Sequence, residues 1–440
     1  MKSVLILGAG LVAGPHVRYL LDTAGFAVTV ASRTVGKAET LLDGASNGTA
    51  VALDVRDERI LEELIASHDL SVSLLPYVYH PTVAGYCVKH RRPMVTTSYV
   101  KDEMRRFDIP AREAGVILLN EIGVDPGIDH MSAMQVIDGI HDGGGRLVSF
   151  TSNTGGLPAP EANDNPFGYK FSWAPRGVLL AGKNSARFLK DGETVDVQGS
   201  ELFAHHWPCE IVGFGDLEVY PNRDSLPYVE TYGIPGVKTM FRGTLRYPGW
   251  CETLTRIVGL GLLDEAERGD LEGQTFTQLT ARLIGEGERA TKEHLAGFLG
   301  LPQDAKPIND LEWLGFLSDE PLPAGSTSLL DVLVGRMLEK MKYASGERDM
   351  LIMQHEFVAE YSNRVEKTTS TLVDYGVPNG DSSMSRLVGL PAAIAARRIL
   401  EGEIDLAGVH IPTVPELYGP ILDELASLGM AFTETVELLQ

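Results

Sequence analysis

Short apolar runs alternate with amphipathic segments over roughly the first 130 residues of the chain. Runs of apolar and β-branched residues are typical of buried strands, and they occur at 4–7, 27–31, 49–53, 70–75, 94–97 and 116–119. Helical spacing of apolar residues predicts helices at 15–24, 58–68 and 81–90. Strands that alternate with helices indicate a parallel sheet with right-handed crossovers. We therefore expect an α/β fold with a doubly wound, Rossmann-type sheet.

The pattern changes after the glycine run at 143–145. Residues 146–250 are richer in aromatic residues, proline and glycine, and they contain strand-like segments. Helical and charged segments follow from about 264 to 343, strand-like segments return at 348–375, and the chain is helical from about 386 onward. This order predicts a second domain of mixed α/β type, interrupted by a helical segment.

Composition and charge narrow the possible functions. The 440 residues are 44% apolar and 22% charged, which suits a globular protein of two or three domains. There are 38 Lys+Arg and 60 Asp+Glu residues, so the formal net charge is −22. Phosphate backbones and anionic lipids repel so acidic a chain, and we expect it to bind neither nucleic acid nor a membrane.

The few cysteines and histidines argue against a metal site and a disulfide framework. Cys87, Cys209 and Cys251 form no CxxC pair, which indicates a reducing compartment, and we expect the protein to be cytoplasmic. His205 and His206 are adjacent, so their side chains diverge on a strand or a helix, and we expect no metal. We also expect neither a signal peptide nor a membrane span, because no apolar run approaches roughly 18 residues.

A glycine-rich turn follows the first predicted strand. It has the G-x-G-x-x-A pattern of a dinucleotide site and comprises Gly8, Ala9, Gly10, Leu11 and Val12, with Ala13 as the last position. The first glycine permits a tight turn, the second lets the backbone approach a pyrophosphate, and the helix that follows offers free N–H groups. The turn therefore predicts binding of a nicotinamide dinucleotide.

The end of the second predicted strand distinguishes NADP from NAD. An NAD site usually has a carboxylate there for the ribose 2′-hydroxyl, whereas this chain has Ser32, Arg33 and Thr34. A guanidinium and two hydroxyls can bind a 2′-phosphate, so we predict NADP. Asp54 and Val55 follow the third strand, and we place them near the adenine, with Asp54 accepting from its amino group.

Several longer motifs identify a family. GAGLVAGP, SLLPYVYHPTV, VTTSYV, NEIGVDPGIDHM, GGLPAPEANDNPFGYKFSW, YPNRDS, RGTLRYPGW and ELYGPIL together resemble saccharopine dehydrogenase of the glutamate-forming type. The resemblance implies a Rossmann domain at 1–131 that is completed by about 388–440. It implies a substrate-binding and dimerisation domain at 132–262 and 345–387, and an all-α insert at 263–344. Thr154 stands where we expect a cysteine in this family, so no role of that thiol can apply here.

The resemblance also implies a reaction, a cofactor and an assembly. The family interconverts saccharopine with L-glutamate and L-2-aminoadipate 6-semialdehyde, using NADP for hydride transfer at a secondary amine or imine. We expect a homodimer. Saccharopine carries three carboxylates, so the site needs cations, and we assign Arg223 and Arg246 as carboxylate clamps, with Thr244 and Leu245 beside Arg246. Lys170 is a third candidate.

The loops that follow the predicted strands supply the remaining candidates. They lie at the carboxyl edge of the sheet, where ligands bind in open α/β folds. Leu75, Thr97 and Ser98 are expected to contact the cofactor, and Ser98 and Tyr99 the substrate. Trp173 is expected to pack against the nicotinamide ring.

The proton acceptor stays open among several groups. Asp125 can orient a substrate ammonium or relay the amine proton, although turn formation before Pro126 is its simpler role. Tyr99 and His130 are further catalytic candidates, and a structural role for His130 is equally compatible with the sequence. A bound water or the substrate itself can also take the proton.

Two other functions fit a Rossmann scaffold. A carboxynorspermidine or homospermidine synthase also reduces an imine, but it would need acidic residues for amines rather than Arg223 and Arg246. A non-catalytic NADP-binding sensor would not need the substrate motifs. The sequence leaves the physiological direction open between lysine synthesis and lysine degradation.

Overall fold

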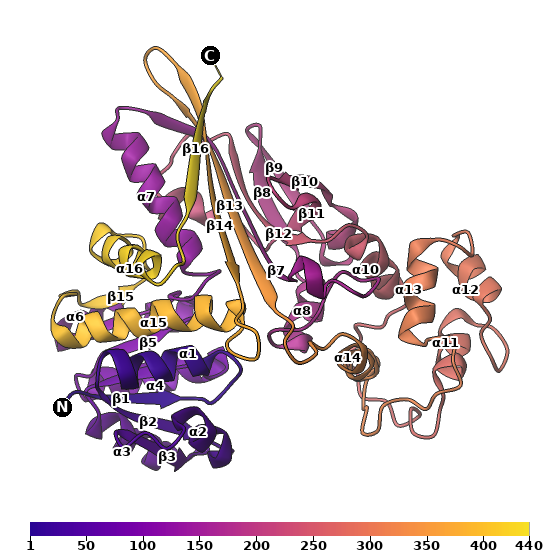
Figure 1. Cartoon of the computed structure of the whole chain (residues 1–440), viewed down its shortest axis with the longest axis horizontal. Coiled ribbons are helices and arrows are strands. Elements are labelled where there is room, and N and C mark those ends of the chain that lie inside the picture. Colours follow the sequence, from indigo (N-terminus) through magenta and orange to yellow (C-terminus); the bar gives the residue numbers. More distant parts are fainter. Residues whose placement is uncertain (440) are drawn as a thin grey trace. The chain divides into compact units, whose positions relative to one another are not determined.

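The computed structural model describes residues 1–439 and divides into two compact units (Figure 1). The first unit comprises Met1–Leu147 and Ala359–Gln440, and the second comprises Val148–Val358. The three-domain division implied by the resemblance stays a prediction.

A parallel sheet forms the centre of the first unit. Its strand order is β15-β6-β5-β4-β1-β2-β3, and its neighbours pair in parallel. The strands are β1 Ser3–Leu7, β2 Ala27–Ser32, β3 Gly48–Ala52, β4 Leu70–Ser73, β5 Met94–Thr96, β6 Ile117–Leu119 and β15 Gly408–His410. The order reverses direction between β1 and β4, which is the switch point at which doubly wound sheets bind ligands. The predicted α/β fold class is confirmed.

Helices cover both faces of this sheet, which explains why its strands read as unbroken apolar runs. The helices of the first unit are α1 Ala13–Arg18, which continues as a π-helical turn, α2 Val35–Leu42, α3 Glu58–Ser67, α4 His80–Lys89, α5 Asp102–Arg105, α6 Asp108–Ala114, α7 Ile128–Asp142, α15 Ser383–Glu401 and α16 Pro415–Ser427. Strands β14 Val365–Tyr375 and β16 Thr433–Leu438 pair antiparallel in the same unit.

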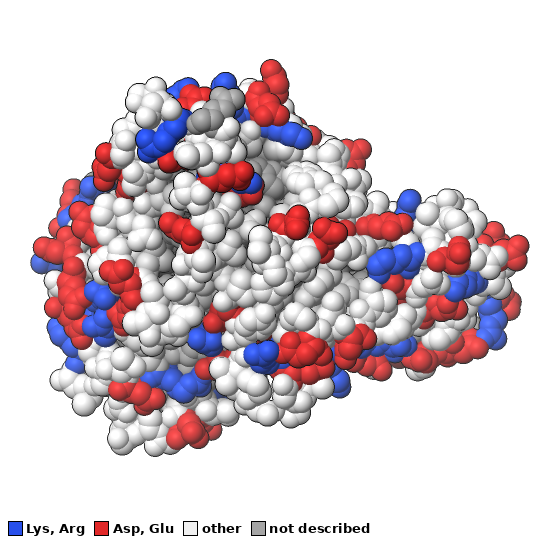
Figure 2. All heavy atoms as spheres, turned by 45° about the horizontal axis from the view of Figure 1, so that its top comes forward, with Lys and Arg blue, Asp and Glu red and all other residues white. Residues whose placement is uncertain are grey.

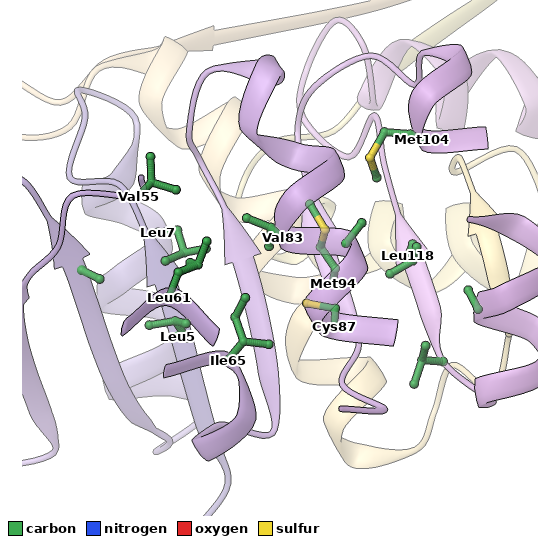
Figure 3. Close-up of a cluster of buried hydrophobic side chains, with 14 of the residues drawn as sticks. Leu5, Leu7, Val55, Leu61, Ile65, Val83, Cys87, Met94, Met104 and Leu118 are labelled. Carbon is green, nitrogen blue, oxygen red and sulfur yellow. The ribbon is translucent and has the colours of Figure 1, made fainter. Parts of the chain in front are cut away.

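The core on one face of the sheet forms between β1, α3 and α4. Leu5 and Leu7 of β1 meet side chains of α3, α4 and neighbouring strands, and all are buried (Figure 3). The members of α3 and α4 that Figure 3 labels are Leu61, Ile65, Val83 and Cys87. This packing fixes the strand ends from which the site loops emerge.

On the other face, a helix from the C-terminal part of the chain packs on the first helix. Helix α15, drawn in orange, contacts α1, drawn in indigo (Figure 1). Close approach requires Gly389, because a Cβ there would lie 2.9 Å from the carbonyl oxygen of Val12. His16 Nδ1 is hydrogen-bonded to the Gly389 carbonyl oxygen at 3.0 Å. The end of the glycine-rich turn and the helix that follows it are thus held by residues far away in the sequence.

The second unit contains a mixed sheet with the order β10-β11-β12-β7-β13. Strand β12 pairs in parallel with β7 and antiparallel with β11, and β8 pairs with β12 and β9. Its strands are β7 Arg146–Pro158, β8 Ala186–Lys190, β9 Glu193–Val197, β10 Trp207–Ile211, β11 Gly215–Pro221, β12 Thr239–Arg246 and β13 Asp349–Glu360. The mixed α/β character that the sequence predicts for this part of the chain is therefore present.

Helices make up the rest of the second unit, and most of them lie between β12 and β13. They are α8 Pro175–Ala181, α9 Pro227–Thr231, α10 Trp250–Gly259, α11 Phe276–Ile284, α12 Lys292–Leu299, α13 Lys306–Leu314 and α14 Leu329–Lys340. Helix α11 begins with a capping box in which Thr275 and Gln278 exchange hydrogen bonds, which explains the sharp start of the helical segment. Within residues 1–439, no helix has both the length and the apolar character of a bilayer span.

Candidate functional site

The glycine-rich turn has the geometry of a phosphate cradle. Gly8 has a φ of 115°, and its N–H donates to the Ala31 carbonyl at 2.9 Å, so the chain turns sharply at the end of β1. Only glycine suits this position, because a Cβ would also lie 3.1 Å from the Leu74 carbonyl oxygen. At Gly10 nothing lies within 4 Å of the place a Cβ would take, so the backbone there is open to an approaching group. Residues 8–12 therefore fit a pyrophosphate.

The loops after β2 and β3 bring two guanidiniums and one carboxylate to the same edge. Arg33 is exposed directly after β2, and the Thr34 N–H donates to Ser32 Oγ at 3.3 Å. Asp54 follows β3 and pairs with Arg56, whose Nη2 lies 2.5 Å from Asp54 Oδ2. Hydrogen bonds from Arg56 and the charge of Arg33 hold the pKa of Asp54 well below its usual range. Arg56 was not among the residues predicted from the sequence.

Two other predicted cofactor residues after these strands lie partly inside the fold. Val55 is buried in the hydrophobic cluster of Figure 3, and the half-buried Leu75 packs against that cluster. Their role as cofactor contacts stays a prediction.

A buried histidine links the ends of β4 and β5. His80 Nδ1 is hydrogen-bonded to Ser73 Oγ at 2.9 Å, and its Nε2 to Ser98 Oγ at 2.8 Å and Thr96 Oγ1 at 3.3 Å. Burial lowers the pKa of His80 to about 4, so the ring is neutral at physiological pH. His80 therefore orients the Ser98 hydroxyl beside Thr97, a positioning role that the sequence did not reveal.

Tyr99 and Asp125 come together at the carboxyl edge of the sheet. The Tyr99 hydroxyl donates to Asp125 Oδ1 at 3.1 Å, although the two residues follow different strands. Both side chains are half-buried. Tyr99 also lines a hollow of about 350 Å³ with His80 and Lys101, so a small molecule can reach the Tyr99 side of this pair.

His130 lies behind this pair rather than in the hollow. Its ring is completely buried, and Nε2 is hydrogen-bonded to Glu121 Oε2 at 2.8 Å. Glu121 Oε1 accepts from the N–H of Val100, the residue after Tyr99, at 2.8 Å. The geometry gives His130 a part in holding the Tyr99 loop, and its role as a base stays a prediction.

In the second unit, Arg246 ends β12 inside a box of aromatic rings. Its side chain is 5% exposed, and the guanidinium carbon lies 4.9 Å from the ring centre of Tyr169, 5.4 Å from Trp250 and 5.8 Å from Tyr220. Its Nη1 donates to the Leu245 carbonyl at 2.7 Å. Within residues 1–439, Arg246 Nε and Trp250 Nε1 are buried without a hydrogen-bond partner. Unpaired N–H donors around a cation suit a carboxylate.

Other predicted residues adjoin this box. Burial raises the pKa of Tyr220 to about 12, although Arg246 and a hydrogen bond with Thr244 oppose the shift. Burial also raises the pKa of Tyr169, and the nearby Arg246 and Trp173 oppose the shift. The structure therefore brings Trp173 and Thr244 together with Arg246 around phenols that keep their protons.

Lys170 and Arg223 have surroundings that the sequence did not predict. Lys170 is buried, and its Nζ lies 2.8 Å from both Asp164 Oδ1 and Glu347 Oε2. Burial opposes the charge of Lys170, but these two carboxylates outweigh it and raise the lysine pKa. Two protein carboxylates thus compete with any substrate carboxylate for Lys170, whose binding role stays a prediction.

Arg223 is an exposed residue with a φ of 57°, a conformation uncommon outside glycine. The neighbouring Asp224 pairs with Arg187 at 3.5 Å. Arg223 therefore lies in a strained turn, and its neighbour Asp224 already has Arg187 as an ionic partner. Both observations are compatible with the predicted role of Arg223 as a carboxylate clamp.

Comparison with known proteins covers almost the entire chain. Residues 4–119 match the family described as "Saccharopine dehydrogenase NADP binding domain", and residues 123–430 match "Saccharopine dehydrogenase C-terminal domain". The chain is 43% identical over 449 residues to "Saccharopine dehydrogenase [NADP(+), L-glutamate-forming]" of Schizosaccharomyces pombe, covering 99% of each protein. It is 41% identical to the Saccharomyces cerevisiae protein of the same description, covering 96% of each.

Animal relatives are longer than this chain. "Alpha-aminoadipic semialdehyde synthase, mitochondrial" of Bos taurus is 40% identical over 98% of this chain, but only 47% of that protein is covered. The similarity therefore spans about half of the animal protein.

Solved structures support the same assignment. The apo saccharopine dehydrogenase (L-Glu forming) from Saccharomyces cerevisiae matches with a TM-score of 0.92 and 38% identity, covering 99% of this chain and 100% of that one. A homospermidine synthase from Legionella pneumophila shares the fold at a TM-score of 0.56 but only 10% identity. From the full-length similarity to the fungal proteins, we conclude that this chain belongs to the saccharopine dehydrogenase family.

Proposed function

We propose that the protein is an NADP-dependent saccharopine dehydrogenase of the L-glutamate-forming type. It interconverts saccharopine with L-glutamate and L-2-aminoadipate 6-semialdehyde. The observation that carries this proposal is the similarity over 99% of both chains to the Schizosaccharomyces pombe protein of that description. The donor-rich surroundings of Arg246 supply an independent physical reason, because they suit an anionic substrate.

NADP fits the residues of the first unit. The turn at Gly8–Val12 would hold the pyrophosphate, and Arg33 with Ser32 would hold the 2′-phosphate. When bound, the nicotinamide accepts the hydride from the carbon next to the secondary nitrogen of saccharopine. Trp173 is the proposed packing partner of that ring.

The residues at the edge of the parallel sheet handle protons. The secondary amine must lose a proton before hydride transfer, and Asp125, bonded to the Tyr99 hydroxyl, is the proposed acceptor. The resulting imine adds water and releases glutamate. In the reverse direction the same pair returns the proton to the nitrogen.

The substrate carboxylates need cations and donors in the second unit. Arg246 is the proposed principal clamp, because its Nε and the Trp250 indole N–H point to no other described group. Arg223 is the proposed second clamp. A polyamine substrate is not favoured, because a buried guanidinium repels an ammonium group.

We further propose that the enzyme is a cytoplasmic homodimer. The few cysteines, which are free in the structure, and the family resemblance support this proposal. Light scattering of the purified protein at micromolar concentration tests it, with twice the 47.7 kDa chain mass as the expected result.

A coupled measurement tests the activity. Saccharopine and NADP are mixed with the purified protein, and reduced nicotinamide is followed by absorbance while glutamate is quantified by mass spectrometry. One glutamate for each reduced cofactor is expected. Carboxynorspermidine serves as the control substrate and should give no reduction. Reduction with the polyamine alone would exclude the proposed substrate.

A further inference from the structure

An acidic side chain lies at the edge where the 2′-phosphate of NADP is proposed to bind. The Leu53 N–H donates to the Ser32 carbonyl at 3.0 Å, so the segment after β3 is tied to the end of β2. Asp54 follows directly, and the charge of Arg33 already influences its pKa. A carboxylate at this edge repels a phosphate, which favours NAD over NADP.

Arg56 engages both oxygens of this carboxylate. Its backbone N–H and its Nε each lie 3.0 Å from Asp54 Oδ1, and its Nη2 lies 2.5 Å from Asp54 Oδ2. Hydrogen bonds and charge from Arg56 are the leading causes that lower the Asp54 pKa, so the carboxylate stays ionised and paired. The Arg56 side chain is 73% exposed, so few other contacts compete for it.

The pair changes the role that the sequence suggested for Asp54. Each carboxylate oxygen has about two lone-pair sites for hydrogen bonds, and here each oxygen of Asp54 already accepts two hydrogen bonds from Arg56, which leaves little capacity for the adenine amino group. The sum of the side-chain charges at this edge shows what Arg56 contributes to phosphate binding. Arg33 and Arg56 against Asp54 leave one net positive charge, whereas without Arg56 the sum would be zero.

We infer that Arg56 is a selectivity residue for NADP, which acts by neutralising Asp54 beside the 2′-phosphate that Arg33 binds. The inference rests on the proposed cofactor. It assigns Arg56 to electrostatic masking, with the direct phosphate contact left to Arg33. This role involves neither substrate nor catalysis, so nucleotide binding alone tests it.

The experiment compares two nucleotides by isothermal titration of the full-length protein. Adenosine 2′,5′-bisphosphate carries the 2′-phosphate and 5′-AMP lacks it. Arg56→Ala should weaken the affinity for the bisphosphate by about three- to tenfold, as expected for a screened charge near the surface. The affinity for 5′-AMP should stay within about twofold of wild type. The loss should shrink as salt rises.

A double variant separates masking from other roles. In Asp54→Asn/Arg56→Ala no carboxylate remains to be masked, so bisphosphate affinity should return to within about twofold of wild type. The matched control is Arg59→Ala, which removes a similarly exposed arginine paired with Glu63 in the following helix and should change neither nucleotide.

Three results would overturn the inference. In the first, the double variant binds the bisphosphate as weakly as Arg56→Ala does. In the second, Arg56→Ala loses the same affinity for both nucleotides. In the third, Arg56→Ala loses no affinity for the bisphosphate. If the proposed cofactor NADP were wrong, the result would differ from all three, because the wild-type protein would then bind the two nucleotides equally well.

Discussion

Arg246→Lys tests the proposed substrate site most directly. The change keeps one positive charge but removes Nε, which is buried without a partner among residues 1–439, and the flat guanidinium that lies 4.9 Å from the Tyr169 ring centre. A charge-assisted hydrogen bond contributes about 1.5–3 kcal/mol, and a cation–π contact about 0.5–2 kcal/mol. Lysine retains part of both, so we expect a net loss of about 2 kcal/mol in transition-state binding, or about 30-fold in kcat/KM.

The assay is initial-rate kinetics with saccharopine at saturating NADP, accompanied by the Kd for NADP and by thermal unfolding. The expected loss is confined to saccharopine, with NADP binding unchanged. Arg242→Lys is the matched control, since Arg242 is a buried arginine of the same strand that lies 4.5 Å from the Tyr228 ring centre. Its kcat/KM per folded molecule should stay within about threefold of wild type. An Arg246→Lys enzyme with unchanged kcat/KM would remove Arg246 from the site.

Three further predictions concern residues of the first unit. Arg33→Asp should lower the ratio of kcat/KM for NADP over NAD by about tenfold or more, because a carboxylate replaces a cation beside the 2′-phosphate, and an unchanged ratio would refute that role. His130→Gln should lower the free energy of unfolding by about 1–3 kcal/mol, measured in urea, because it loosens the buried bond to Glu121, and unaltered stability would contradict the holding role. Burial lowers the pKa of His16 to about 4 despite its hydrogen bond to the Gly389 carbonyl. As pH falls, His16 is therefore protonated in the unfolded chain, where its pKa is about 6.5, before it is protonated in the folded protein. The stability linked to neutral His16, about 3 kcal/mol, is thus complete above pH 6.5 and is lost as pH falls toward 4. His16→Asn should therefore flatten the fall in unfolding free energy over that range, and an identical slope would contradict it.

The parallel sheet could be predicted because its signals are local. Each strand is a short apolar run, and the turn at Gly8 is encoded by residues that follow one another. The pairing of β15 with β6 joins residues nearly 300 positions apart, and no local pattern encodes it. Only the family resemblance suggested that the C-terminal part completes this domain.

The candidate site was predictable to the extent that its residues fall inside motifs. Tyr99 and Asp125 were both named, but their hydrogen bond depends on two strand ends meeting in space. The link from His80 to Ser98 was missed for the same reason, since it joins the start of α4 to the loop after β5. Arg56 had a signal, an arginine two residues after Asp54, but only the observed pairing shows what it does.

Net charge and local electrostatics point in different directions in this protein. The formal charge is −22, and on the face drawn in Figure 2 acidic and basic side chains are interspersed rather than sorted into patches. Solvent ions screen such exposed charges over about 10 Å at 0.1 M salt, whereas a group 5% exposed, such as Arg246, is screened much less. One buried guanidinium with unpaired N–H donors beside it can therefore select a carboxylate inside an acidic protein. The exposed Arg33 has no such burial to strengthen its field, so a neighbouring carboxylate that Arg56 did not pair with would weaken its attraction for a phosphate more easily.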